Sequence, residues 1–281
     1  METQKEKIIL GGNNTNQNIP PQSMPNEFID NEFLVPTEDV ELPSKGVFYA
    51  NNKKTAKIKY LTAEEDDVLF SPELIKSGKV LDALLQIAII DKDLNPNDMI
   101  IGDRNAVLIY LRRTGFGDVY QPGKVTCPSC GEEYVPDIDL SLLKMKFLED
   151  MPDENGWYNF LLPTMKKNIK FRMLTGNDEN KISKASNSGV KKGTGKYQVS
   201  KGVTERYRLQ IMEVEGNKDK IYIAKLISAM PMRDSIAFRE YAKLISPGID
   251  LNYNFECKHC GHTYEDEVPM TYKLFYPNAD V

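Results

Sequence analysis

The chain has 281 residues, of which 41% are hydrophobic and 27% are charged, the composition of a soluble globular protein. Its formal net charge of −5 excludes a global basic field that would attract nucleic acid or an anionic membrane surface. No apolar run approaches the roughly 18 residues of a membrane span, and the first residues are not apolar enough for a secretory signal. We therefore expect a cytosolic compartment, where thiols stay reduced.

The start of the chain changes character at about residue 25. Residues 1–25 are rich in Asn, Gln, Pro and Gly, so we predict a disordered N-terminal arm. Residues 26–145 are predicted to form a first α+β unit. Within it, residues 55–61 alternate apolar and polar side chains as a strand does. Thr62 and Glu65 follow with the spacing of a capping box, which predicts a helix start.

Two further helices are predicted in this unit. Residues 80–90 place their apolar side chains on one helical face: Leu81, Leu84, Leu85 and Ala88. Residues 103–115 begin at a capping residue, Asp103, and end at Gly115, which predicts a short buried helix. The chain then runs extended into its first pair of cysteines.

The second half of the chain repeats the order of the first. Three pairs of segments match: 40–66 with 159–179, 84–92 with 208–218, and 102–131 with 233–261. The spacings also agree, because Cys127 follows Asp103 by 24 positions and Cys257 follows Asp234 by 23. Matched landmarks in one order indicate an internal duplication. We therefore predict a second α+β unit over residues 155–281.

A Gly- and Lys-rich segment, residues 186–202, interrupts the second unit. It is the most basic part of the chain, with Lys191, Lys192, Lys196 and Lys201. We interpret it as a flexible, solvated insert. The alternative is a loop that contacts a partner or a nucleic acid.

The four cysteines fall into two similar phrases, "CPSCGEEY" and "CKHCGHTY", with knuckles at 127–131 and 257–261. Zn²⁺ prefers four tetrahedral ligands, and thiolates satisfy it. The Gly after each second cysteine, Gly131 or Gly261, permits the positive φ of a tight knuckle. Two such hairpins make the two halves of a zinc-ribbon-like site. We predict a structural Zn²⁺ that joins the units through four ligands: Cys127, Cys130, Cys257 and Cys260.

Alternatives to a structural zinc site are weaker. Redox-active thiols would need an activated cysteine in a thioredoxin-like context, which the Gly-bearing knuckles do not suggest. A catalytic zinc keeps one position open for water, whereas four thiolates close the site. His259 and His262, the only histidines, lie in the second knuckle. They could replace a ligand, but we expect them at exposed knuckle tips.

Signals for catalysis are missing. The sequence contains neither phosphate-binding glycine loop, and no histidine remains to activate a nucleophile. The acidic clusters at 64–67 and 177–180 are explained by helix N-termini, where negative charge is stabilised. The aromatic tail, residues 272–277, is expected to pack as a final strand rather than to form an exposed docking strip. We predict no catalytic residues, no small-molecule substrate and no membrane partner.

Several phrases resemble a known family: "LPSKGVFY", "LTAEEDDVLFSPELIKSGKVLDALL", "GDRNAVLIYLRRTGFGDVY", "CPSC" and the closing "FYP". They are similar to the baseplate hub and hub-assembly proteins of T4-like contractile-tailed bacteriophages, over most of residues 40–277. The resemblance implies a non-enzymatic protein of virion morphogenesis. Its partners would be other baseplate or tail proteins, and it would act in the host cytoplasm during assembly, with a place in the virion baseplate also open.

A zinc-ribbon protein that binds nucleic acid or takes part in transcription is the alternative. It would need a basic surface near the knuckles, where the sequence offers Lys124 and Lys258. The residues beside the knuckles are mostly acidic instead: Glu132, Glu133, Glu265, Asp266 and Glu267. Nucleic acid is therefore an improbable partner.

Overall fold

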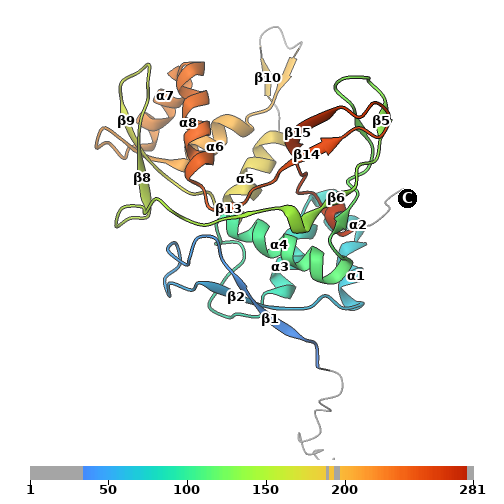
Figure 1. The fold of residues 1–281 in the computed structure, drawn as a ribbon. Coiled ribbons are helices and arrows are strands. Elements are labelled where there is room, and N and C mark those ends of the chain that lie inside the picture. The colour runs from blue at the N-terminus through green and yellow to red at the C-terminus, as the bar shows by residue number, and fades with distance from the viewer. Residues whose placement is uncertain (1–33, 188–189, 193–196, 277–281) are drawn as a thin grey trace, which may run out of the picture. The chain divides into compact units, whose positions relative to one another are not determined.

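The computed structural model describes residues 34–187, 190–192 and 197–276, and Val35–Val281 form one compact unit. Helices and several small sheets alternate along it, which confirms the α+β class (Figure 1). The predicted arm, residues 1–25, lies outside the described residues, as do 188–189 and 193–196 of the predicted insert. None of the helices in the described part has both the length and the apolar composition of a membrane span.

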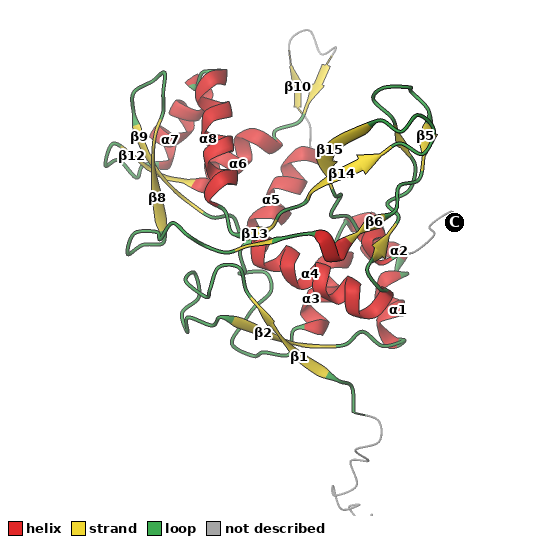
Figure 2. Cartoon of the chain, viewed as in Figure 1, coloured by secondary structure: helices red, strands yellow, loops and turns green. Residues whose placement is uncertain are grey.

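The first elements form a hairpin followed by four helices (Figure 2). Their bounds are β1 Thr37–Glu41, β2 Thr55–Lys59, α1 Glu64–Leu69, α2 Pro72–Ser77, α3 Val80–Ala88 and α4 Ile101–Phe116. The predicted strand and helices all occur. The sequence interpretation missed α2, although Ser71 caps its start by accepting a hydrogen bond from Leu74 N and Gly78 ends it at φ 69°.

Two predicted helix starts differ in detail. The Glu65 carboxylate accepts a hydrogen bond from Thr62 N at 2.6 Å, which is one half of the predicted capping box, but the residue at the cap position is Ala63 and α1 begins only at Glu64. Asp103 is not a cap, because α4 begins at Ile101 and places Asp103 in its first turn. The helix also runs past Gly115, since the residue that stops it is Gly117.

A chain of short strands links the two halves and carries the cysteines. It contains β3 Val119–Tyr120, β4 Val125–Thr126, β5 Glu133–Tyr134, β6 Ile138–Asp139, the 3₁₀ turn η2 Leu140–Leu142 and β7 Met145–Lys146. Strands β4 and β5 form the first knuckle hairpin, whereas β3 pairs with β6. The link therefore folds back against the end of α4.

The second half begins with its own hairpin. Its elements are β8 Trp157–Leu161, β9 Asn168–Arg172, α5 Gly176–Asn187, β10 Val190–Lys192, β11 Tyr197–Val199, α6 Gly202–Gln210, β12 Ile211–Val214, α7 Lys220–Ala229 and α8 Met232–Ile245. The chain ends with β13 Gly248–Ile249, β14 Asn252–Glu256, β15 Thr263–Glu267 and the 3₁₀ turn η3 Tyr272–Phe275. The sheet order β12-β9-β8 makes β9 the central strand of three.

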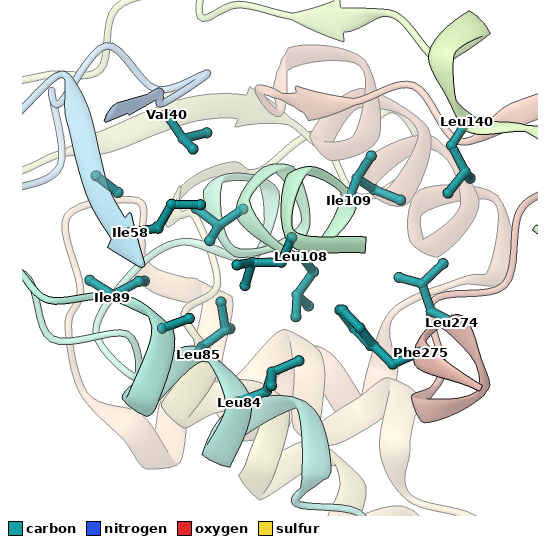
Figure 3. Close-up of a cluster of buried hydrophobic side chains, with 14 of the residues drawn as sticks. Val40, Ile58, Leu84, Leu85, Ile89, Leu108, Ile109, Leu140, Leu274 and Phe275 are labelled. Atoms are coloured by element: carbon teal, nitrogen blue, oxygen red, sulfur yellow. The ribbon is translucent and has the colours of Figure 1, made fainter. Parts of the chain in front are cut away.

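Two hydrophobic cores lie inside this unit. The first core surrounds α3 and α4, and the second lies between the β8–β9–β12 sheet and α6, α7 and α8. Leu274 and Phe275 of the C-terminal tail are buried in the first core, in the same cluster as Leu84 and Leu108 (Figure 3). The tail thus packs on the core as predicted, but as a 3₁₀ turn rather than a strand. It returns from the second half to complete the first.

Equivalent carboxylates hold the turn that follows each opening strand. Asp103 of α4 accepts hydrogen bonds from Ser44 N at 2.9 Å and from Tyr49 Oη at 2.6 Å. Asp234 of α8 accepts from Thr164 N at 2.6 Å and from Met165 N at 2.9 Å. Each Asp is the third residue of its helix, and both are fully buried. Buried carboxylates in such positions need these donors, because an unpaired charge there is costly.

The middle helices also occupy similar places, with one change of register. Helix α3 ends before Ile89, which bridges to Ile58 of β2, and α6 ends before Ile211, which pairs with Phe171 of β9. Both helices have nine residues. If the ends of the two helices are taken as corresponding points, Ile89 corresponds to Ile211. The sequence match of 84–92 with 208–218 is displaced from this correspondence by two positions.

An ion pair joins the end of each hairpin to the helix that follows. Lys59 pairs with the buried Glu65 at 2.7 Å, and Arg172 pairs with the buried Asp178 at 2.7 Å. Thr175 N also donates to Asp178, at 3.0 Å. The sequence interpretation assigned these acidic residues only to helix N-termini and missed their basic partners.

Replacing Asp178 by Asn should lower the free energy of unfolding at pH 7 by about 1–2 kcal/mol, because Arg172 loses a charged partner. Burial raises the pKa of Asp178, but hydrogen bonds from Arg172 and Thr175 outweigh it and hold that pKa below its usual value. This stabilisation is present above the unfolded-state pKa near 3.9 and is lost as the pH falls through the lower, folded-state pKa. Urea unfolding should show that the difference in free energy of unfolding between the unaltered protein and the variant narrows as the pH falls from 7 towards 3.

The exposed Lys181 supplies a matched control for this variant. Its Nζ lies 3.9 Å from Asp178 Oδ1, but its side chain is 60% exposed. Lys181→Ala should therefore change the free energy of unfolding by less than about 0.5 kcal/mol. A deficit of Asp178→Asn that stays constant across the pH range would contradict the role assigned to the carboxylate.

Candidate metal centre

The two cysteine knuckles have the same backbone geometry. In the first, Cys127 N donates to Glu132 O at 3.0 Å and Gly131 N donates to Cys127 O at 3.0 Å. In the second, Cys257 N donates to His262 O and Gly261 N donates to Cys257 O, both at 2.9 Å. Gly131 and Gly261 have φ values of 75° and 69°. These values favour glycine, since other residues rarely adopt them.

The four predicted ligands are brought together between the two hairpins. Cys127 Sγ lies 3.8 Å from Cys260 Sγ, and Cys130 Sγ lies 3.8 Å from Cys257 Sγ. All four sulfurs lie within 4.8 Å of one another. Four sulfurs at about 2.3 Å from one tetrahedral Zn²⁺ would be about 3.8 Å apart. The cluster therefore has the size of a tetrahedral thiolate site, and its cysteines are free rather than joined in disulfides.

Backbone amides favour thiolate at the cluster. Ser129 N and His259 N each lie 3.4 Å from the sulfur two residues before, Cys127 and Cys257. The N–H of Cys130, together with that of Ser129, lowers the pKa of Cys127 to about 6 despite some desolvation. The N–H of Glu132 favours the Cys130 thiolate too, but desolvation and the other sulfurs outweigh it and raise that pKa to about 12. Thiolates this close repel one another, so a dication is the natural partner for the set.

The cluster has a buried and an exposed side. Cys127 and Cys257 are buried, whereas Cys130 and Cys260 are exposed. Tyr134 and Tyr264 pack beneath the buried pair, with their hydroxyls 3.0 Å apart. An ion held by the four sulfurs would thus lie near the surface, over a small hydrophobic cluster.

Both histidines lie beside the cluster and outside it. His259 and His262 are exposed, as expected of knuckle tips. His259 Nε2 lies 3.2 Å from Glu133 O of the other hairpin, and the His262 ring stacks on Tyr264. A second contact across the hairpins joins Lys258 Nζ to Asp137 Oδ2 at 2.8 Å. The sequence interpretation missed both cross-hairpin contacts, because they join residues more than 100 positions apart.

The comparisons with known proteins agree with the resemblance found in the sequence. A family model described as T4 bacteriophage base plate protein matches residues 39–274, which include both knuckles. No curated protein matches the chain significantly, and no solved structure does. The matched range covers most of the chain. The chain belongs to the T4 bacteriophage base plate protein family.

Proposed function

We propose that this baseplate protein is a non-enzymatic component or assembly factor of the baseplate hub, stabilised by a structural zinc. The observation that carries the zinc assignment is the meeting of four thiols, from hairpins more than 120 positions apart, within 4.8 Å. A site closed by four thiolates suits structure, because no position is left for a substrate or a reactive water. The partners would be other baseplate or tail proteins, in the host cytoplasm during assembly or in the finished virion.

We also infer that the chain arose by duplication of one α+β piece. Support comes from the repeated order of hairpin, helices and knuckle, and from the matched carboxylates Asp103 and Asp234. The basic–acidic pairs at the ends of β2 and β9 support it too. Each unit ends in one knuckle, at 127–131 or 257–261. The zinc would then join two copies of one ancestral piece.

The hub assignment is tested in phage that lack the chain. Their lysates should contain capsids but no complete baseplates, as seen by electron microscopy, and a plasmid copy of the gene should restore them. Mass spectrometry of finished particles separates the two roles, since a component stays in the virion and an assembly factor does not. Complete, infectious tails formed without the chain would exclude both roles.

A nucleic-acid-binding zinc ribbon is the alternative, and the surface of the knuckles does not favour it. Glu132, Glu265 and Asp266 are exposed beside the cluster. Lys258, one of the few basic residues there, is engaged by Asp137. An acidic surface repels phosphate groups. Binding of DNA or RNA at low salt would be needed to revive this alternative.

A further inference from the structure

A groove of about 740 Å³ opens between the start of α4, the end of α8 and β13. Its lining includes the buried side chains Met173, Leu174 and Ala242, which form an apolar floor. The backbone is tightly closed on one side of it, because a Cβ on Gly102 would lie 1.9 Å from Pro247 O. The groove is thus built on fixed elements of both halves and is separate from the cysteine cluster.

Two amide side chains border the groove without a partner. Gln210 is only 7% exposed, and its amide makes no hydrogen bond to any residue that the structure describes. Asn105 of α4 is half-buried, lines the same groove and likewise has no partner in the described part of the chain. The polar atoms of both amides reach the groove, because the fully buried side-chain atoms that lack a partner among the described residues belong to other residues. These two amides are therefore suited to a ligand that both donates and accepts, as a peptide group does.

The charges of the lining favour an acidic ligand. Arg206 and Arg239 are exposed and make no ion pair with the described residues. Lys146 and Lys243 also line the groove but are already engaged, Lys146 by carbonyls at the end of α8 and Lys243 by Glu267. Two other acidic residues lie on the lining: Asp250, which caps Asn252, and the exposed Glu240. Arg206 nevertheless already interacts electrostatically with the Glu179 carboxylate. The available cation is therefore Arg239, which can bind a carboxylate with two hydrogen bonds.

We propose that this groove binds an extended segment of a partner polypeptide that carries an acidic side chain. The amides of Asn105 and Gln210 pair with its main chain, Arg239 binds its carboxylate, and the apolar floor receives a neighbouring side chain. The proposal rests on the proposed function in baseplate assembly and names the surface that a baseplate partner would occupy. A second copy of the chain is the competing occupant.

Site-specific photo-crosslinking in infected cells tests the proposal on the full chain. Leu244 lines the groove and is 68% exposed, so Leu244→p-benzoylphenylalanine places the probe at its rim. Leu142, 63% exposed in η2 and not part of the lining, takes the same probe as a control position. Mass spectrometry of the crosslinked product should map it to an acidic segment of one baseplate polypeptide.

A charge-reversal variant supplies the second part of the crosslinking experiment. Arg239→Glu should reduce the crosslink yield at Leu244 about tenfold or more, which corresponds to the loss of one charged contact. Arg208→Glu makes the same change on α6, but Arg208 lies outside the lining and pairs with Glu205 at 3.5 Å. That control should leave the yield within about twofold. The melting temperature of each variant is measured alongside, so that misfolding is recognised.

Three results would overturn the proposal. They are a yield at Leu244 no higher than at Leu142, a crosslink only to a second copy of this chain, and a crosslink unaffected by Arg239→Glu. The outcome is separable from that of the proposed function. If baseplates fail without the chain while the groove captures nothing, the hub role stands and the groove assignment falls.

Discussion

Replacing Cys127 by Ser should lower the melting temperature by about 10–20 °C, and a strong chelator should do the same to the unaltered protein. The cysteines that the proposed zinc would join are 127 and 133 positions apart. Cross-linking a loop of this size removes about 5 kcal/mol of chain entropy from the unfolded state. For a chain of this length each kcal/mol moves the melting temperature by roughly 2–4 °C.

The controls for this prediction lie in the same knuckle. Ser129 contributes only its backbone N–H to the cluster, so Ser129→Ala should leave both metal content and melting temperature unchanged. The double variant Cys127→Ser/Cys257→Ser should lose little more than either single variant, since the first loss already opens the site. Calorimetry with elemental analysis measures both quantities.

Two results together would refute the proposal that a zinc ion stabilises the fold by joining the two hairpins. If the purified protein contains no metal and chelation leaves its melting temperature unchanged, the four thiols do not stabilise the fold through an ion. One zinc per chain with an unchanged melting temperature would instead place the metal in a local role, confined to the two hairpins.

The cysteine cluster was predictable because its signal is local and repeated. A C-x-x-C-G phrase is enough to predict one knuckle. Because the chain has two such phrases and no other cysteine, each knuckle can only be paired with the other. Helix α3 was predictable for a similar reason, since its apolar spacing appears within nine residues. The α+β class follows from such local patterns. What they have in common is that neighbouring residues carry the whole signal.

The long-range contacts were not predictable. Nothing near Leu274 and Phe275 indicates that the tail returns to the first core, because a burial partner leaves no mark on the local pattern. Asp103 at a helix start looks like a cap, and only the approach of Ser44 in space shows that its carboxylate holds a distant turn. The groove beside α8 is invisible for the same reason, since its lining comes from six separate segments of the chain.

The two buried carboxylates should respond differently to the same substitution. Asp103→Asn should lower the free energy of unfolding by about 1–2 kcal/mol, and Asp234→Asn by about 3 kcal/mol. Two of the donors to Asp103 are hydroxyls, Ser44 Oγ and Tyr49 Oη, which can rotate and accept from the new amide. Asp234 instead accepts from two backbone N–H groups, one on each carboxylate oxygen, so one of them must face an N–H₂ that cannot accept, although the Thr164 hydroxyl also contributes to holding the charged form.

The pKa directions lead to the same ranking and add a dependence on pH. Burial raises the pKa of Asp103 by more than its hydrogen bonds lower it, so the fold tolerates a neutral group there and an amide resembles one. Burial also acts on Asp234, but the N–H groups of Thr164 and Met165 outweigh it and hold that pKa below its usual value. The stabilisation from Asp234 is therefore present above the unfolded-state pKa and is lost as the pH falls through the lower, folded-state pKa. Asp103 behaves in the opposite way, because its ionisation costs stability as the pH rises through its raised, folded-state pKa. Urea unfolding at pH 7 and pH 3 should show the Asp234→Asn deficit in free energy of unfolding shrinking in acid and the Asp103→Asn deficit growing. Equal deficits at both positions would mean that hydroxyl and backbone donors are equivalent here, and the distinction between the two turns would be wrong.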